Sequence, residues 1–437
     1  MSSLQYHLEQ YLCACVRKAF RREHPVVVGI AGSVGKSSTK TAIGVALGAG
    51  EEGSGVVATE KNYNTELGVP MTVFGSPLPR RNPFTWALLL VKATSAALGL
   101  SRLSARTYVL ELGTDRPGEL PRLVRTVEPT VGVLTAIGLE HTEFFGSVEG
   151  VAKEESAILR LLQQDGFAVI NADDRLVRTA ADTADVRQIS FGTAEGATVR
   201  ILSTKVILDQ NLPDHSGLEV VITMFNITMT VLLTGTVGKP QAFAAAAALA
   251  CAAALDQDER IAMERLRTGF HGMPGRMRLL EGIKQTWLID DSYNSSPLAA
   301  ASAIEDLSAF PLTGAGRRIA AMGDMLELGT LAESAHRDMG RAVGKSGIDI
   351  FVACGTLAHV AAKAATDAGM SEENVFTFAT STEAGRFIQD RLKPHDVVLI
   401  KGSQGSRMER ISKELMAHPD KAEKLLVRHT KDWLAKA

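Results

Sequence analysis

One short stretch near the N-terminus restricts what this chain can fold into more than any other. Residues 26–30 (Val-Val-Val-Gly-Ile) form the β-branched run that is typical of a buried parallel strand. A glycine-rich turn from Gly32 to Gly35 follows, and a helical segment begins at Lys36. Glycines let backbone N–H groups approach phosphate oxygens, and a helix N-terminus adds partial positive charge. The order of strand, glycine turn and helix therefore predicts a nucleoside triphosphate site.

The side chains of this loop sharpen the prediction. We expect the Lys36 ammonium on the β- and γ-phosphates and the Ser37 hydroxyl facing a magnesium ion. The generic P-loop pattern requires glycine where this chain has Ile30, so it fails at one position. An ordinary glycine turn would leave the paired hydroxyls of Ser37 and Ser38 unexplained. Six loop residues are expected to bind the nucleotide: Gly32, Ser33, Gly35, Lys36, Ser37 and Ser38.

Composition excludes several classes of protein. The 437 residues are 45% apolar with a formal net charge of −2, which describes an ordinary soluble globular protein with an ample core. Because no domain-wide basic excess is visible, nucleic acid is not expected as a main partner. The cysteines lack metal-ligand spacing and are interpreted as reduced thiols of a cytoplasmic protein. They are Cys13, Cys15, Cys251 and Cys354.

The polar first residues and two apolar stretches decide whether a membrane segment is expected. The first residues do not form a signal peptide, because no small-residue cleavage site follows an apolar core. Residues 84–100 carry Lys92 in their middle and are too short for a comfortable span, and residues 242–255 are shorter still. No transmembrane helix is predicted. Residues 4–22 form an amphipathic helix with a basic end, which either packs on the next domain or contacts a membrane surface.

The order of predicted elements divides the chain into three parts. Residues 1–24 hold the amphipathic helix, and residues 25–272 form a P-loop ATPase-type α/β domain with a parallel sheet. Within it, residues 198–235 predict a small antiparallel β excursion. Residues 269–275 are dense in glycine and proline and mark a linker. Residues 273–437 alternate strands and helices and predict a Rossmann-like C-terminal α/β domain.

Two polar residues follow strands of the first predicted sheet. Glu111 closes the strand Val-Leu-Glu, and His141 follows the next strand within Gly-Leu-Glu-His-Thr. The carboxyl ends of parallel strands meet at one edge of a sheet, so both residues should lie beside Lys36. A carboxylate there can reach the magnesium of Mg-ATP, and the histidine is interpreted as a metal-site residue.

Several motifs together resemble the Mur ligase family. The loop of residues 32–38 is similar to the ATP loop of that family, and the other matching segments follow in the family's order. They span residues 62–70, 111–113, 135–146, 171–174, 274–276, 290–294, 323–329 and 401–403. The segments Asp-Asp-Ser-Tyr-Asn and Gly-Asp-Met-Leu-Glu-Leu-Gly resemble the branch that adds a dipeptide to a peptidoglycan precursor.

The resemblance implies a reaction and a cofactor set. Such ligases use ATP with Mg²⁺ to phosphorylate a carboxylate, and an amine then attacks the acyl phosphate to form a peptide bond. Lys36, His141 and Arg276 are expected to be catalytic, with Arg276 reaching the γ-phosphate from the linker. The resemblance also implies that Asp291 and Asn294 contact the nucleotide. It also places five residues near the substrates: Asn64, Glu327, His336, Lys401 and Ser403.

Three departures from the family pattern are visible. Where the family has a carbamoylated lysine that bridges a second magnesium, this chain has Glu155, with Lys153 two residues earlier. We interpret Glu155 as a metal ligand, joining Ser37, Glu111 and His141. In the segment that contacts adenine, Gln241 keeps an amide that could bind the base. Finally, too few residues precede the first strand to form the family's N-terminal UDP-binding domain.

The predicted function is therefore an ATP-dependent amide ligase that adds D-alanyl-D-alanine to a peptidoglycan stem-peptide precursor. The expected partners are small molecules, and the protein is expected to be a cytoplasmic monomer. The sugar-nucleotide end would be held by residues 77–103 or the N-terminal helix, unless the acceptor lacks a UDP group. Two alternatives stay open. The missing N-terminal domain favours a Mur-type ligase for another carboxylate and amine, and Glu155 favours a nucleotide-binding partner subunit that has lost ligation.

Overall fold

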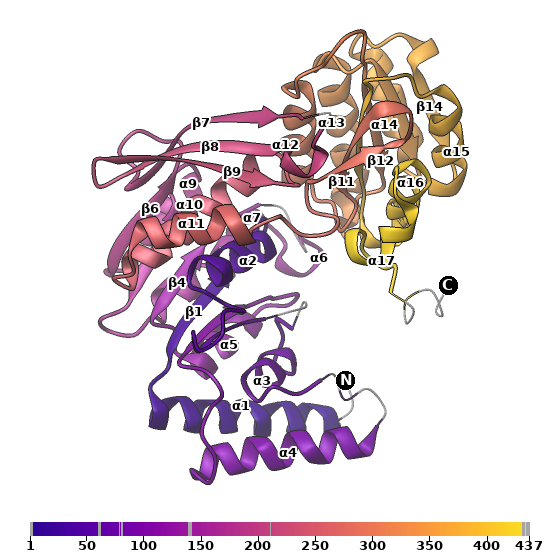
Figure 1. The fold of residues 1–437 in the computed structure, drawn as a ribbon. Coiled ribbons are helices and arrows are strands. Elements are labelled where there is room, and N and C mark those ends of the chain that lie inside the picture. Colours follow the sequence, from indigo (N-terminus) through magenta and orange to yellow (C-terminus); the bar gives the residue numbers. More distant parts are fainter. Residues whose placement is uncertain are drawn as a thin grey trace.

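Two β-sheets, one after the other along the chain, organise the molecule. The computed structural model describes residues 3–59, 63–77, 79, 82–138, 142–209, 211–430 and 433. The nine strands of the first sheet lie in the order β2-β3-β1-β4-β5-β6-β7-β8-β9, and the six strands of the second in the order β10-β11-β15-β12-β13-β14. Figure 1 shows the second sheet and its helices, in orange and yellow, at the opposite end from helices α1 and α4.

The first sheet is parallel from β2 to β7 and antiparallel beyond. Its strands, in spatial order, are β2 (Val56–Ala58), β3 (Thr107–Glu111), β1 (Val26–Ala31), β4 (Val131–Leu134), β5 (Phe167–Asn171), β6 (Arg187–Gly192), β7 (Val199–Ile207), β8 (Gly217–Met224) and β9 (Ile227–Thr234). The predicted antiparallel excursion is confirmed, and pairing of β6 with β7 makes it part of the main sheet. Strands β2 and β6 were not predicted, because neither has an unbroken β-branched run.

Helices cover both faces of this sheet and build two separate cores. One core contains α2 (Lys36–Ala46), α10 (Lys239–Ala254) and α11 (Glu259–Gly269), and alanines bury most of α10. The other contains α1 (Ser3–Glu23), α3 (Gly68–Val73), α4 (Pro83–Leu98), α5 (Glu119–Val127), α7 (Val148–Glu155), α8 (Ala157–Arg160) and α9 (Arg175–Asp182). Short α6 (Thr142–Phe145) precedes α7. The predicted packing of the N-terminal helix on the next domain is thus confirmed.

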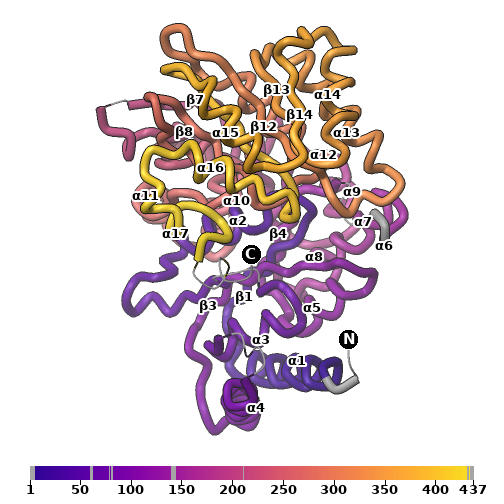
Figure 2. Tube along the Cα trace, turned by 90° about the vertical axis from the view of Figure 1, so that its right-hand side faces the viewer, coloured from indigo at the N-terminus to yellow at the C-terminus, as the bar shows by residue number. Residues whose placement is uncertain are grey.

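The second sheet is parallel except at its first strand. It consists of β10 (Arg278–Gly282), β11 (Thr286–Asp291), β15 (Val397–Lys401), β12 (Arg318–Gly323), β13 (Ile350–Cys354) and β14 (Val375–Phe378). One face carries α12 (Pro297–Ser308), α13 (Ala332–Lys345) and α14 (Ala358–Asp367), and the other α15 (Ser381–Arg391), α16 (Glu409–Leu415) and α17 (Ala422–Leu425). Figure 2 shows most of these helices in the upper half of the view, with α1, α3 and α4 of the first domain at the bottom. No helix in the described part of the chain has the length and apolar character to cross a bilayer.

A buried carboxylate joins the helices of the two sheets. Asp306 of α12 accepts a hydrogen bond at Oδ1 from the backbone N–H of Lys239, which begins α10, at 3.0 Å. Its Oδ2 atom is buried without a hydrogen-bond partner among the described residues. Burial, aided by the negative charges of Asp291 and Glu305, raises the pKa of Asp306 from 3.8 to about 7. The N–H of Lys239 favours the charged carboxylate and opposes this rise, so burial and the neighbouring negative charges outweigh the contact.

Asp306→Asn should remove a pH-dependent part of the stability. A carboxyl group with a raised folded-state pKa contributes stability below its unfolded pKa of 3.8, and that stability is lost as pH rises through about 7. We expect the Tm of Asp306→Asn to rise relative to that of the wild type from pH 5 to pH 7, and the difference to level off above pH 7. The corresponding change in the free energy of unfolding is about 1–2 kcal/mol. Thermal unfolding across that range checks this, and a constant difference would contradict it.

Candidate active site

The glycine-rich loop lies between the ends of two strands and helix α2. Gly32 has φ +126°, and a Cβ atom there would lie 2.3 Å from Thr135 Oγ1, so no larger residue fits. The Thr135 hydroxyl donates to the carbonyl of Val34 at 2.7 Å, and the Ser33 N–H donates to the carbonyl of Ala136 at 2.7 Å. The sequence predicts this strand over residues 131–137, but it ends at Leu134. The next two residues, Thr135 and Ala136, form hydrogen bonds with the loop.

The register of β1 and β3 places the predicted metal ligand Glu111 beside this loop. Glu111 pairs with Ile30, two residues before Gly32, and only 3% of Glu111 is exposed. Its Oε1 accepts from Asn64 Nδ2 at 3.3 Å, and its Oε2 is buried without a hydrogen-bond partner among the described residues. A buried carboxylate oxygen without a donor is costly unless a cation completes it. Glu111 and the buried Ser37 hydroxyl therefore fit Mg²⁺, which prefers oxygen ligands.

Glu155 lies on the other side of the loop. It ends α7, is 4% exposed, and accepts at Oε2 from the backbone N–H of Gly32 at 2.7 Å. Lys153, in contrast, is exposed. His141 falls outside the described residues, and within them no three or more His, Cys, Asp or Glu side chains gather as a metal cluster. Glu111 and Ser37, both in the described part of the chain, are residues that would hold such an ion.

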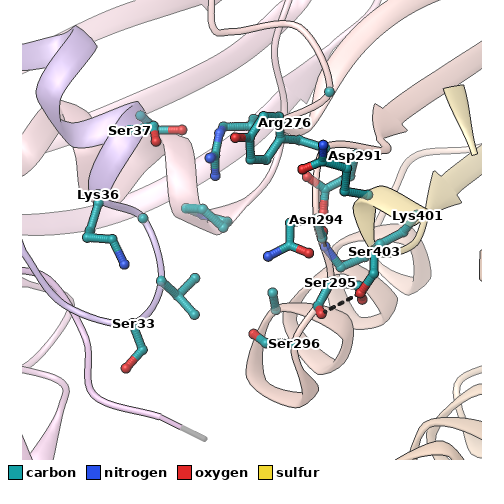
Figure 3. A pocket seen from close by; sticks show the side chains of 18 of the residues that line it. Ser33, Lys36, Ser37, Arg276, Asp291, Asn294, Ser295, Ser296, Lys401 and Ser403 are labelled. Atoms are coloured by element: carbon teal, nitrogen blue, oxygen red, sulfur yellow. Dashed lines mark hydrogen bonds and ion pairs between the residues drawn. The ribbon is translucent and has the colours of Figure 1, made fainter. Parts of the chain in front are cut away.

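The second sheet supplies the facing wall. Asp291 and Lys401 pair across β11 and β15, and their side chains form an ion pair at 2.7 Å with Lys401 only 2% exposed. The Lys401 ammonium also donates to the carbonyl of Asn294 at 3.0 Å, which fixes the turn after β11. Figure 3 shows Lys36 and Ser33 on one side of the cavity and Asp291, Asn294 and Lys401 on the other.

The linker carries Arg276 between these walls. The Gly275 N–H donates to Asp290 Oδ2 at 3.0 Å, and the Tyr293 N–H donates to the carbonyl of Gly275 at 3.0 Å. The guanidinium of Arg276 stacks on the Tyr293 ring, with Cζ 4.2 Å from its centroid. Asp290 is fully buried, and that burial raises its pKa to about 6. Within the described part of the chain, no carboxylate forms an ion pair with Arg276, so its positive charge stays available in the cavity.

Gln241 completes the nucleotide side of the cavity. It is 1% exposed, and its Nε2 donates to the carbonyl of Arg276 at 3.0 Å and lies 3.3 Å from Ser38 Oγ. Its Oε1 is buried without a donor among the described residues. An amide oxygen in this state suits an exocyclic amine such as that of adenine.

Most residues predicted from the sequence surround one cavity of about 640 Å³, a size typical of small-molecule sites. Its lining includes Ser33, Gly35, Lys36, Ser37, Ser38, Asn64, Glu111, Gln241, Arg276, Asp291, Asn294, Glu327, Lys401 and Ser403. Gly32, which begins the loop, and Glu155, which bonds to it, do not line the cavity. The structure thus brings the glycine-rich loop of the first domain and residues 276–403 together around one cavity, as a reaction between two domains requires.

His336 does not join this cavity. It is fully buried on α13, where its Nε2 accepts from the Met325 N–H at 3.0 Å and its Nδ1 lies 2.6 Å from the carbonyl of Ala332. Both ring nitrogens are therefore used within the second domain. The expected position beside the amine substrate is corrected to one behind the loop of residues 325–328, which lines the cavity.

Two functional candidates were missed by the sequence reasoning. Tyr293 positions Arg276, and it lies inside the Asp-Asp-Ser-Tyr-Asn segment that was already singled out. Lys40 is 2% exposed one helical turn after Lys36, near Glu111, and burial lowers its pKa. The spacing of four residues on α2 was the available signal, because it places Lys40 on the same face as Lys36.

Comparison with known proteins gives matches along most of the chain. The Mur ligase middle domain matches residues 91–254, and the Mur ligase, glutamate ligase domain matches residues 275–404. The UDP-N-acetylmuramoyl-tripeptide–D-alanyl-D-alanine ligase of Bacillus subtilis is 27% identical over 393 residues, covering 90% of this chain and 76% of that protein. Its Escherichia coli counterpart is 27% identical over 424 residues, covering 94% and 83%.

Solved structures agree with the sequence matches. A crystal structure of MurF from Acinetobacter baumannii superposes with a TM-score of 0.73 and 26% identity, covering 92% of this chain and 79% of that one. The MurF ligase of Thermotoga maritima in complex with ADP has the same fold, with a TM-score of 0.75 at 24% identity and coverage of 95% and 84%. With its two characteristic domains matched in order, this chain belongs to the Mur ligase family.

Proposed function

We propose that this chain is an ATP-dependent ligase that joins D-alanyl-D-alanine to the stem peptide of a UDP-linked peptidoglycan precursor. The relatives reported above carry that activity in their names. The observation that carries the proposal is the single cavity into which Lys36 of one domain and Arg276, Asp291 and Lys401 beside the other all project. We also propose that the enzyme works in the cytoplasm as a monomer.

The first step forms an acyl phosphate. A carboxylate oxygen of the precursor attacks the γ-phosphorus of ATP, the bond to the β-phosphate oxygen breaks, and ADP leaves. Charge builds on the transferred phosphoryl oxygens, so cations preorganised around them lower the barrier. Lys36 and Arg276 supply two such charges, and the loop N–H groups supply dipoles. Mg²⁺ held by Glu111 and Ser37 would screen the phosphate charges.

The second step forms the amide. The amine of the dipeptide attacks the acyl carbon, and phosphate and a proton leave. We propose that Asn64, Glu327 and Ser403 contact the peptide substrates, since all three line the cavity beyond the nucleotide residues. Lys401 is held by Asp291, so in this arrangement it orders the turn at Asn294. A closed cavity protects the acyl phosphate from water.

The experiment that tests the function measures phosphate release from ATP with defined substrates. We expect turnover only when UDP-N-acetylmuramoyl-tripeptide and D-alanyl-D-alanine are both present, with the matching product mass. Turnover with a different amine or acceptor would redirect the proposal to another Mur-type ligation. No turnover with any pair from a mixed pool, despite ATP binding, would favour a nucleotide-binding subunit.

Glu111→Gln should weaken metal binding and leave the fold intact. The amide keeps the contact with Asn64 and loses the charge that faces Mg²⁺. We expect the Mg²⁺ concentration for half-maximal nucleotide binding, measured by calorimetry, to rise about tenfold. Glu149→Gln is the matched control, because Glu149 is an exposed glutamate on α7. Equal Mg²⁺ dependence of the two variants would rule out Glu111 as a ligand.

Glu155 is proposed to replace the carbamoylated lysine of the family with a permanent carboxylate. Its contact with the loop N–H and the exposure of Lys153 support this assignment over carbamoylation of Lys153. Glu155→Gln should reduce kcat about 100-fold, since it keeps the Gly32 contact and loses the charge. Lys153→Ala should retain activity.

A bicarbonate experiment distinguishes loss of the negative charge at position 155 from a change in local structure. Wild-type turnover should not depend on bicarbonate, whereas Glu155→Lys should recover turnover as bicarbonate is added, because a carbamate restores the missing negative charge. Loss of activity in Lys153→Ala with full activity in Glu155→Gln would reverse the assignment.

A further inference from the structure

Helix α4 presents a continuous apolar stripe to solvent. Phe84 is 80% exposed, Val91 66% and Leu98 67%, and Leu88 between them is 44% exposed. Their spacing of four, three and seven residues places them on one face of the helix. Leu100, just after the helix, is 78% exposed and extends the stripe. These residues, Phe84, Leu88, Val91, Leu98 and Leu100, are called the α4 stripe below.

The α4 stripe does not result from a poorly formed helix. Asn82 caps the N-terminus by accepting from the backbone N–H groups of residues 84 and 85, and Gly99 ends the helix in a left-handed conformation. The opposite face buries Leu89, Ala93 and Ala96 in the core that also holds α1. The helix is therefore apolar on two faces, and only one of them is covered by the protein. A contiguous exposed patch of this kind marks an interaction surface.

The charge around the stripe is one-sided. Residues 76–106 contain no Asp or Glu, although the whole chain has a net charge of −2. The same residues contain five basic ones: Arg80, Arg81, Lys92, Arg102 and Arg106. Arg102 and Arg106 are exposed, as is Lys18 of the adjacent helix α1. Glu23 of α1 is engaged by Arg22 and by the backbone N–H of Leu103.

The position of α4 leaves this surface open. Both views place α4 at the outer edge of the molecule, beneath α1 and far from the C-terminal domain. The cavity is lined by residues of the loop before α2 and of the second domain, and Figure 1 shows α2 on the side of the first domain away from α4. A partner seated on α4 would thus leave the catalytic cavity accessible.

We propose that the α4 stripe docks on the surface of an anionic lipid bilayer. The apolar side chains enter the boundary between headgroups and acyl chains, and the exposed Lys18, Arg102 and Arg106 supply positive charge for the anionic headgroups. A second copy of the chain fits less well, because an isologous dimer would bring two acid-free basic segments together. The inference rests on α4 alone and is independent of the proposed ligation.

Vesicle binding by the full chain tests the proposal. We expect co-sedimentation with phosphatidylcholine vesicles that contain half phosphatidylglycerol, and about tenfold weaker partitioning for Phe84→Ser/Val91→Ser/Leu98→Ser. These side chains are exposed, so the variant should keep the wild-type circular dichroism spectrum and melting curve. The matched control is Phe225→Ser in the β8–β9 turn, where Phe225 is 61% exposed. The control should bind as the wild type does.

Charge is tested separately. Arg102→Glu should weaken binding several-fold, and raising salt from 0.1 to 0.5 M should do the same, whereas Arg386→Glu on distant α15 should have no effect. The proposal is overturned if the chain ignores anionic vesicles, if the stripe variant binds as well as the wild type, or if pure phosphatidylcholine binds equally. It is also overturned if the chain forms a dimer in solution that the stripe variant abolishes.

Discussion

The buried carboxylate of Asp290 is the contact on which the geometry of the cavity depends. It receives the N–H of Gly275 from the linker, 15 residues earlier, and the hydroxyl of Ser412 from α16, 122 residues later. Fixing Gly275 fixes the direction of Arg276, which then stacks on Tyr293. Because Asp290 is fully buried, each of these hydrogen bonds offsets part of its desolvation cost. The buried Asp290 thus positions the positively charged side chain of Arg276 in the active site.

The parallel strands explain why much of the site could be predicted from the sequence. Residues at the carboxyl ends of strands must share an edge, so Lys36 and Glu111 could be placed together before any coordinates were known. The same logic places Asp291 beside Lys401 in the second sheet. Strand and helix positions followed from apolar runs, which is why the short β2 and the irregular β6 were missed.

Side-chain direction was the part that the sequence could not provide. His336 lies in the domain that matches the family, but its ring points inward because it bonds to two backbone groups of its own domain. Lys40 is buried although no recognised motif required it. Tertiary packing decides the orientation of such side chains, and the motifs alone do not specify that packing. Tyr293 shows the converse, since its motif was recognised and only its stacking partner was unknown.

The departures from the family pattern occur at places where the chain must supply charge or surface by other means. Glu155 brings a carboxylate to the loop from a shorter side chain than a carbamoylated lysine, and the Gly32 N–H holds it there. Residues 76–106 contain helix α4, whose outer face is apolar where an ordinary protein surface is polar, and their charged residues are all basic. Exposing such a helix to water is unfavourable, so the sequence keeps it at a cost that only a contact outside the described chain would offset.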